Sequence, residues 1–139
     1  MKAREYFDKI ERKERVLRNK KEDLEELEAI ATSMNKPLGK DNVKSSGEKD
    51  KLGKIVCDIT ELKKEIEQLQ AEVVNLKHDI KDKLYQLDDD RKIFVIKKRY
   101  FDNLGWDEIA SQLDRSYHHI HKLHKQAMNE LDLLLDDTK

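Results

Sequence analysis

The residues from Arg115 to Lys125 carry the side chains of this chain that are best suited to recognising another molecule. They combine cations, imidazole rings, a phenol and a hydroxyl, namely Arg115, Ser116, Tyr117, His118, His119, His121, Lys122 and Lys125. Groups of this kind donate hydrogen bonds to phosphate oxygens and to the edges of bases. The pattern therefore predicts a nucleic-acid-binding helix that begins near residue 116.

The order of these residues divides them into two roles, because a recognition helix contacts bases mainly through its N-terminal residues. We expect base contacts from Tyr117, His118, His121 and Lys122. Arg115, Ser116, His119 and Lys125 are expected nearer the phosphate backbone. Lys97, Lys98 and Arg99, in a preceding segment, add further candidates for phosphate contacts.

The charge of the chain is concentrated in the same region. The whole chain has a net charge of -1, although 42% of its residues are charged. The stretch from Arg91 to Met128 has a net charge of +4, which leaves -5 for the remainder. A basic excess around the candidate helix is what a phosphate-binding surface requires.

The histidines of this region do not predict a metal site. His121 and His124 are three residues apart, but no acidic cluster completes a ligand set and Cys57 is the only cysteine. A pH-sensitive contact with nucleic acid is the alternative role for these rings, since imidazole gains charge near neutral pH. The chain also lacks glycine-rich phosphate loops and nucleophile motifs. We expect no metal, no cofactor and no enzyme activity.

Three short helices are predicted to position these residues, over 91–102, 106–113 and 117–135. Their inward-facing sets are Ile93, Ile96 and Tyr100; Trp106, Ile109, Ala110 and Leu113; and Ile120, Leu123, Ala127, Leu131 and Leu134. Ser116 is a good N-cap, and Asp114 is predicted to adopt a left-handed conformation in the turn before it. Two helices joined by so short a turn are typical of a helix-turn-helix domain.

A long heptad repeat precedes this domain, over residues 51–89. Its seam contains Ile55, Ile59, Leu62, Ile66, Leu69, Val73, Leu76 and Ile80. β-branched residues at the a positions with leucine at d favour a parallel two-stranded coiled coil, and hence a homodimer. Residues 1–33 are also expected to be helical, with a weaker stripe that Lys13 and Lys20 interrupt. If 34–50 is a loop, an antiparallel hairpin within one chain is the alternative.

The C-terminal pattern resembles region 4 of the sigma-70-family factors. The residues that carry the resemblance are Val95-Ile96, Arg99-Tyr100, Gly105-Trp106, Glu108-Ile109-Ala110, Leu113, Ser116, Ile120, Ala127 and Leu131. With the long coil before it, the chain is similar to small sigma-like regulators of Gram-positive phages and prophages, including the ArpU-type late-gene regulators. The sigma regions that melt DNA have no counterpart, so the resemblance implies a promoter-binding regulator.

These patterns together predict an all-α protein with a long helical hairpin or coiled coil at 1–89 and a helix-turn-helix DNA-binding domain at 90–139. The expected function is regulation of phage or prophage transcription, with double-stranded DNA as partner and the coil pairing two chains or docking on RNA polymerase. The alternative is a protein-interaction adaptor that does not bind DNA. No apolar run long enough for a membrane span or a secretory signal occurs, which favours a cytoplasmic location.

Overall fold

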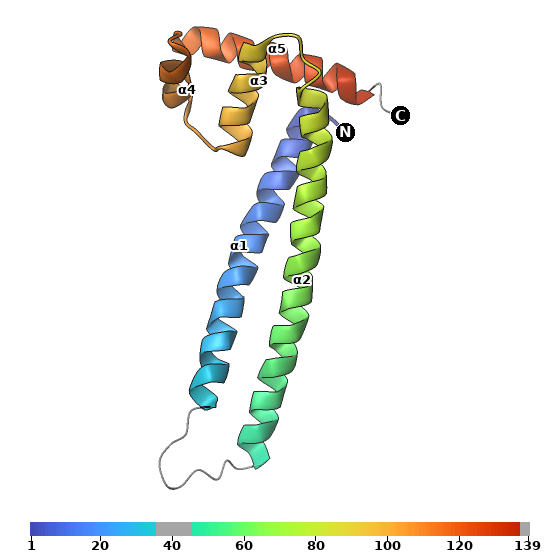
Figure 1. Cartoon of the computed structure of the whole chain (residues 1–139), viewed down its shortest axis with the longest axis vertical. Helices are drawn as coiled ribbons and strands as arrows, with labels where there is room; N and C mark the ends of the chain where they lie inside the picture. The colour runs from blue at the N-terminus through green and yellow to red at the C-terminus, as the bar shows by residue number, and fades with distance from the viewer. Residues whose placement is uncertain (36–45, 137–139) are drawn as a thin grey trace. The chain divides into compact units, whose positions relative to one another are not determined.

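The structure is a computed structural model that describes residues 1–35 and 46–136, and every regular element in these ranges is a helix. Figure 1 shows the elements α1 (Ala3–Met34), α2 (Ser46–Leu84), α3 (Asp90–Ile96), the π-helical turn η2 (Lys97–Phe101), α4 (Trp106–Leu113) and α5 (Tyr117–Asp136). The all-α class is therefore confirmed for the described residues. None of the described helices is long and apolar enough to cross a membrane.

The chain divides into two compact units that differ from the expected ranges 1–89 and 90–139. The terminal unit contains residues 1–11 and 75–139, and the helical-pair unit contains residues 12–74. Both α1 and α2 therefore contribute one end to the terminal unit and the rest of their length to the other. The physical reason lies in the apolar residues that these two ends supply to a shared core.

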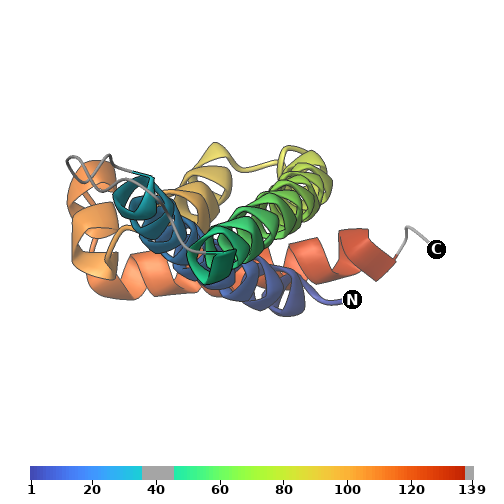
Figure 2. The same cartoon turned by 90° about the horizontal axis from the view of Figure 1, so that it is seen from below.

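Two ion pairs align α1 and α2 within the helical-pair unit. The Lys13 Nζ lies 2.7 Å from Glu72, and the Lys20 Nζ lies 2.8 Å from Glu65. A step of seven residues forward on α1 matches seven residues backward on α2, so the helices run antiparallel, side by side in both views (Figures 1 and 2). The Lys20–Glu65 pair is exposed and the Lys13–Glu72 pair is only partly buried, so each contributes about a kcal/mol or less. The two pairs therefore select the register more than they hold the helices together.

The predicted seam of α2 is partly buried inside this single chain. Ile66 and Val73 have exposed fractions of 7% and 6%, and Ile80, in the terminal unit, is fully buried. The other members of the predicted seam, Ile55, Ile59, Leu62, Leu69 and Leu76, are half-buried. The homodimer stays a prediction. Three residues of the seam assigned to it, Ile66, Val73 and Ile80, are already buried by contacts within one chain.

The core of the terminal unit joins both ends of the chain. Its buried residues are Ala3, Phe7 and Ile10 from α1, Ile80 and Leu84 from α2, Leu87, Ile96 from α3, and Ala127 and Leu131 from α5. The Phe7 ring stacks on Tyr100 at 4.1 Å between centroids and meets the edge of Phe101 at 5.9 Å. The backbone N–H of Ala3 also donates to Asp132 at 2.8 Å. The first turns of α1 are thus part of the unit that contains the candidate site.

A second core cluster holds α3, α4 and α5 together. Val95, Ile109, Ile120 and Leu123 are buried in it, and Trp106, Ala110 and Leu113 pack against it. The predicted inward-facing sets of α4 and α5 are accordingly buried or half-buried.

Three local predictions need correction. The loop expected over 34–50 ends earlier, because α2 begins at Ser46; residues 36–45 lie outside the described part. The helix expected over 91–102 changes at Lys97 into a π-helical turn, in which the Asp102 N–H donates to the Lys97 carbonyl at 3.0 Å. The apolar stripe expected over residues 1–33 begins with Ala3, Tyr6 and Ile10 and omits Phe7, which is only 5% exposed. The π turn lets Tyr100 and Phe101 both contact Phe7.

Phe7→Ala should destabilise the terminal unit by about 3 to 5 kcal/mol, because it leaves a cavity between α1 and the rings of η2. Urea unfolding followed by the fluorescence of Trp106, the only tryptophan of the chain, reports on this unit. Tyr85→Ala is the matched control, since that ring is 57% exposed, and it should cost less than about 1 kcal/mol. An equally small effect of Phe7→Ala would show that α1 does not stabilise this unit.

Candidate nucleic-acid interface

The turn between α4 and α5 has the geometry that its residues predict. Asp114 adopts the left-handed conformation, with φ 53° and ψ 48°, and its N–H donates to Ser111 at 3.2 Å. The N–H of Arg115 donates to the Ala110 carbonyl at 3.1 Å. Ser116 caps α5, because its Oγ accepts the His119 N–H at 3.2 Å. Local hydrogen bonds therefore satisfy the helix ends and fix the short connection.

The first half of α5 and the turn before it expose six of the eleven predicted DNA-contacting residues. Arg115, Ser116, Tyr117, His118, Lys122 and Lys125 are all exposed. Of these, His118, Lys122 and Lys125 follow one another at spacings of four and three residues, so they lie on one face of the helix. The cations of Arg115, Lys122 and Lys125 form no ion pair with the described residues. Their charge is available to an anionic ligand.

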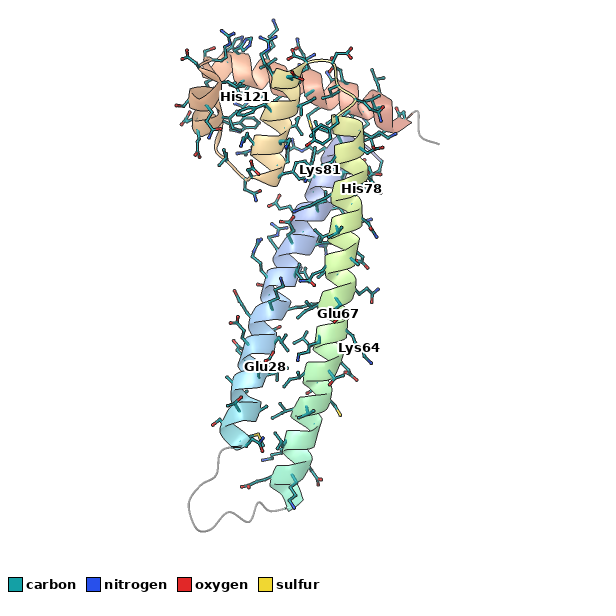
Figure 3. All side chains as sticks on the ribbon, viewed as in Figure 1. Glu28, Lys64, Glu67, His78, Lys81 and His121 are labelled. Carbon is teal, nitrogen blue, oxygen red and sulfur yellow. The ribbon has the colours of Figure 1, made fainter. Side chains whose placement is uncertain are left out.

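His121 lies elsewhere, where α4 and α5 meet (Figure 3). Its ring is 4.5 Å from the Trp106 centroid and 4.3 Å from Tyr117. The guanidinium of Arg99 lies over the Trp106 ring, 4.4 Å from its centroid. Trp106 thus packs against both an imidazole and a cation and holds α4 against α5. The base contact expected of His121 remains a prediction, since its ring is half-buried here.

The predicted phosphate ligands of η2 already have partners within the chain. Arg99 donates to the Leu104 carbonyl at 3.2 Å, in addition to its contact with Trp106. Lys98 pairs with Asp102 at 3.2 Å and lies over Phe94. Lys97 lies 5.6 Å from the centroid of Tyr85. All three are half-buried, so they are less available for phosphate contacts than the cations of α5.

His124, for which the sequence offers only a pH-sensitive contact with nucleic acid as a role, links α5 to η2. Its Nε2 is 2.7 Å from the Tyr100 hydroxyl, and its ring meets Trp106 edge-on at 4.9 Å. Burial, and then the charges of His121, Arg4 and Arg99, lower the His124 pKa from 6.5 to about 4. Burial also raises the pKa of Tyr100. At neutral pH a neutral His124 can therefore accept the hydrogen bond of the Tyr100 hydroxyl.

Two further imidazole nitrogens are covered without a hydrogen-bond partner among the described residues, the Nε2 atoms of His119 and His121. Within the same residues, no group of three or more histidine, cysteine, aspartate and glutamate side chains could hold a metal ion. His119 is half-buried, and its N–H is used in the cap of α5. Helical spacing in the sequence could have separated the buried from the exposed histidines. His124 shares the inner face of α5 with Ile120 and Ala127, whereas His118 lies on the opposite face.

The described residues define an all-helical protein with a basic, exposed helix held on an aromatic cluster. Residues 32–132 match a family described as a protein of unknown function, DUF1492, and the chain belongs to this family. The match begins at residue 32, in the last turn of α1, so it leaves out the first turns of this helix, which supply Phe7 and Ile10 to the core. No curated protein and no solved structure matches the chain.

The lowered pKa of His124 predicts a loss of stability in mild acid. The unfolded chain binds a proton on this ring below about pH 6.5, whereas the folded chain does so only near pH 4, so stability is present at neutral pH and falls between these values. Because the ring is partly exposed, the expected loss is about 1 to 2 kcal/mol rather than the full value that the pKa difference implies.

His124→Gln keeps a hydrogen-bond acceptor for Tyr100 but does not titrate. The free energy of unfolding of this variant should therefore depend less on pH between about pH 6.5 and pH 4 than that of the wild type. Urea midpoints measured from pH 7 to pH 4 give the slope of stability against pH. His78→Gln, at an exposed position of α2, is the control and should retain the wild-type slope (Figure 3). A wild-type slope in His124→Gln would show that this ring does not control acid stability.

Proposed function

We propose that this chain is a DNA-binding transcription regulator of the phage or prophage type. In this proposal a long helical hairpin precedes a three-helix domain similar to region 4 of sigma-70-family factors, and α5 enters the major groove. The observation that carries the proposal is the exposed face of α5, on which Lys122 and Lys125, with no ion-pair partner in the described part of the chain, follow a capped helix start. The opposite face of α5 is fully used by the core.

The electrostatics of the face favour a polyanion. Arg115, Lys122 and Lys125 have no acidic neighbour within ion-pair distance among the described residues, so a ligand need not displace one. Neutralising phosphates with such cations releases counterions from DNA, which makes affinity fall steeply with salt. In the proposal Tyr117, which is 53% exposed at the first position of α5, contacts a base or sugar.

Lys122→Glu should reduce affinity for duplex DNA by tenfold or more and reduce the salt slope by roughly one, because it replaces a phosphate or base contact with a repelling charge. Fluorescence anisotropy with promoter-derived and random duplexes at several salt concentrations measures both quantities. Helicity by circular dichroism should stay unchanged, since Lys122 is exposed.

Lys64→Glu is the matched control, because it makes the same charge change at an exposed position of α2 (Figure 3). If both variants lose affinity equally, net charge rather than the face of α5 governs binding. If the wild-type chain shows no salt-dependent binding to any duplex, the adaptor function expected as the alternative gains support instead.

The helical-pair unit supplies the regulator with a surface for another protein, for which RNA polymerase is the candidate expected from the resemblance. Ile66 and Val73 are covered within the chain, which favours docking by one chain over pairing of two chains through the same seam. Val56 and Val74 remain 50% and 63% exposed on α2 and are available for such docking.

Light scattering should therefore give a mass near 16.5 kDa, that of a single chain, at micromolar concentration. The double variant Leu69→Asp with Leu76→Asp should lower helicity without lowering the mass, because it disrupts pairing inside one chain. A wild-type particle of twice this mass, reduced to a single chain in the double variant, would instead establish the homodimer through the seam.

A further inference from the structure

The C-terminal half of α5 borders a hollow that the proposed DNA contacts do not use. The hollow has a volume of about 290 Å³, and Leu87, Leu133 and Leu134 form its apolar wall. Leu87 is 8% exposed and belongs to the core, so its side chain is held in place by packing. Leu133 is 66% exposed, the highest fraction among the large apolar residues of the described chain.

An exposed leucine by itself is ordinary, but here it stands beside a preformed concavity. A side chain from another molecule that entered the hollow would contact the core-anchored Leu87 and cover Leu133. Burying apolar surface on both partners in this way is how anchoring residues produce most of the affinity of an interface. The hollow therefore has the shape and lining of an anchor site.

The charges around the hollow select the partner. The basic groups nearest to it are already paired, Lys92 with Glu130 at 2.7 Å and Arg91 with Asp89 at 3.1 Å. Asp88, at the edge of the hollow, forms no ion pair with the described residues, and the neighbouring Asp90 forms none either. The rim is therefore negative, which repels DNA and attracts cations.

A second hollow at the end of α5 also has more acidic than basic groups in its lining. It is lined by Asp79, Asp82 and Asp136 together with Lys83, Met1, Tyr6 and Leu135. Acidic groups thus outnumber basic ones in both hollows at the C-terminal half of α5, whereas the cations of the N-terminal half have no ion-pair partner among the described residues. A symmetric contact between two copies of this end would bring like charges together, which disfavours a second copy as the occupant.

We propose that the hollow beside Leu133 is a docking site for a basic amphipathic helix of a partner protein. An apolar side chain of that helix fills the hollow, and its lysine or arginine residues face Asp88 and Asp90. This inference goes beyond the proposed regulator function and does not depend on DNA binding, because none of the residues involved belongs to the exposed face of α5 that carries His118, Lys122 and Lys125.

The test uses the full-length ¹⁵N-labelled chain and a synthetic amphipathic helix of leucine and lysine as the probe. Amide resonances of residues 86–88 and 130–134 should shift on titration, while those of the 118–125 face should not. A peptide of leucine and glutamate with the same pattern should bind at least about tenfold more weakly, because the negative rim repels it.

Leu133→Ser should weaken binding of the leucine–lysine peptide by about tenfold, since it removes one apolar contact partner. The single variant Asp88→Asn should also weaken binding of the leucine–lysine peptide, and more so at low salt than at high salt. Ile30→Ser, at an apolar position of α1 that is 47% exposed, is the matched control and should bind as the wild type does. Affinity of Leu133→Ser for duplex DNA should remain at the wild-type level.

Several outcomes would overturn the proposal. Equal binding of the leucine–glutamate peptide would show that the rim does not select charge, and shifts confined to other residues would place the contact elsewhere. A lower particle mass of Leu133→Ser by light scattering would make the hollow an interface between copies of this chain. Loss of DNA affinity in Leu133→Ser, with peptide binding intact, would assign the residue to the DNA surface.

Discussion

The packing of Phe7 against Tyr100 and Phe101 is the contact on which the rest of the terminal unit depends. The segment from Asp90 to Asp136 is shorter than about 60 residues, a length at which one apolar core is marginal. Its charged composition reduces the available apolar surface further. The ends of α1 and α2 supply Phe7, Ile10, Ile80 and Leu84, and these residues complete a core that α3 and α5 could not enclose by themselves.

This dependence explains how the candidate interface stays exposed without weakening the fold. Because α1 and α2 cover the inner side of α5, its outer side does not need to contribute to the core and can carry Lys122 and Lys125. The aromatic cluster around Trp106 then fixes the angle between α4 and α5. Arg99 and His124 belong to this cluster, so two residues that look like ligand contacts in the sequence act here as packing groups.

The two halves of α5 differ in charge and in surroundings, and this separates the surfaces they offer. The half that begins at Ser116 is capped, basic and open, which suits a phosphate backbone. The half that ends at Asp136 contributes to two hollows in which acidic groups outnumber basic ones, which suits a basic protein segment. The two halves of this helix therefore expose charges of opposite sign, and both are anchored on the same core.

The sequence by itself determined the helices and the chemistry of the outer face of α5. Heptad spacing, the Ser116 cap and the left-handed Asp114 depend on neighbouring residues, so their consequences can be derived from local pattern. The tertiary structure alone decided which helix covers the seam of α2. Lys13 and Lys20 looked like interruptions of a stripe, yet they pair with glutamates that lie far away in the sequence. The burial of Phe7 and the low pKa of His124 likewise depend on contacts between distant segments, and no local spacing encodes such contacts.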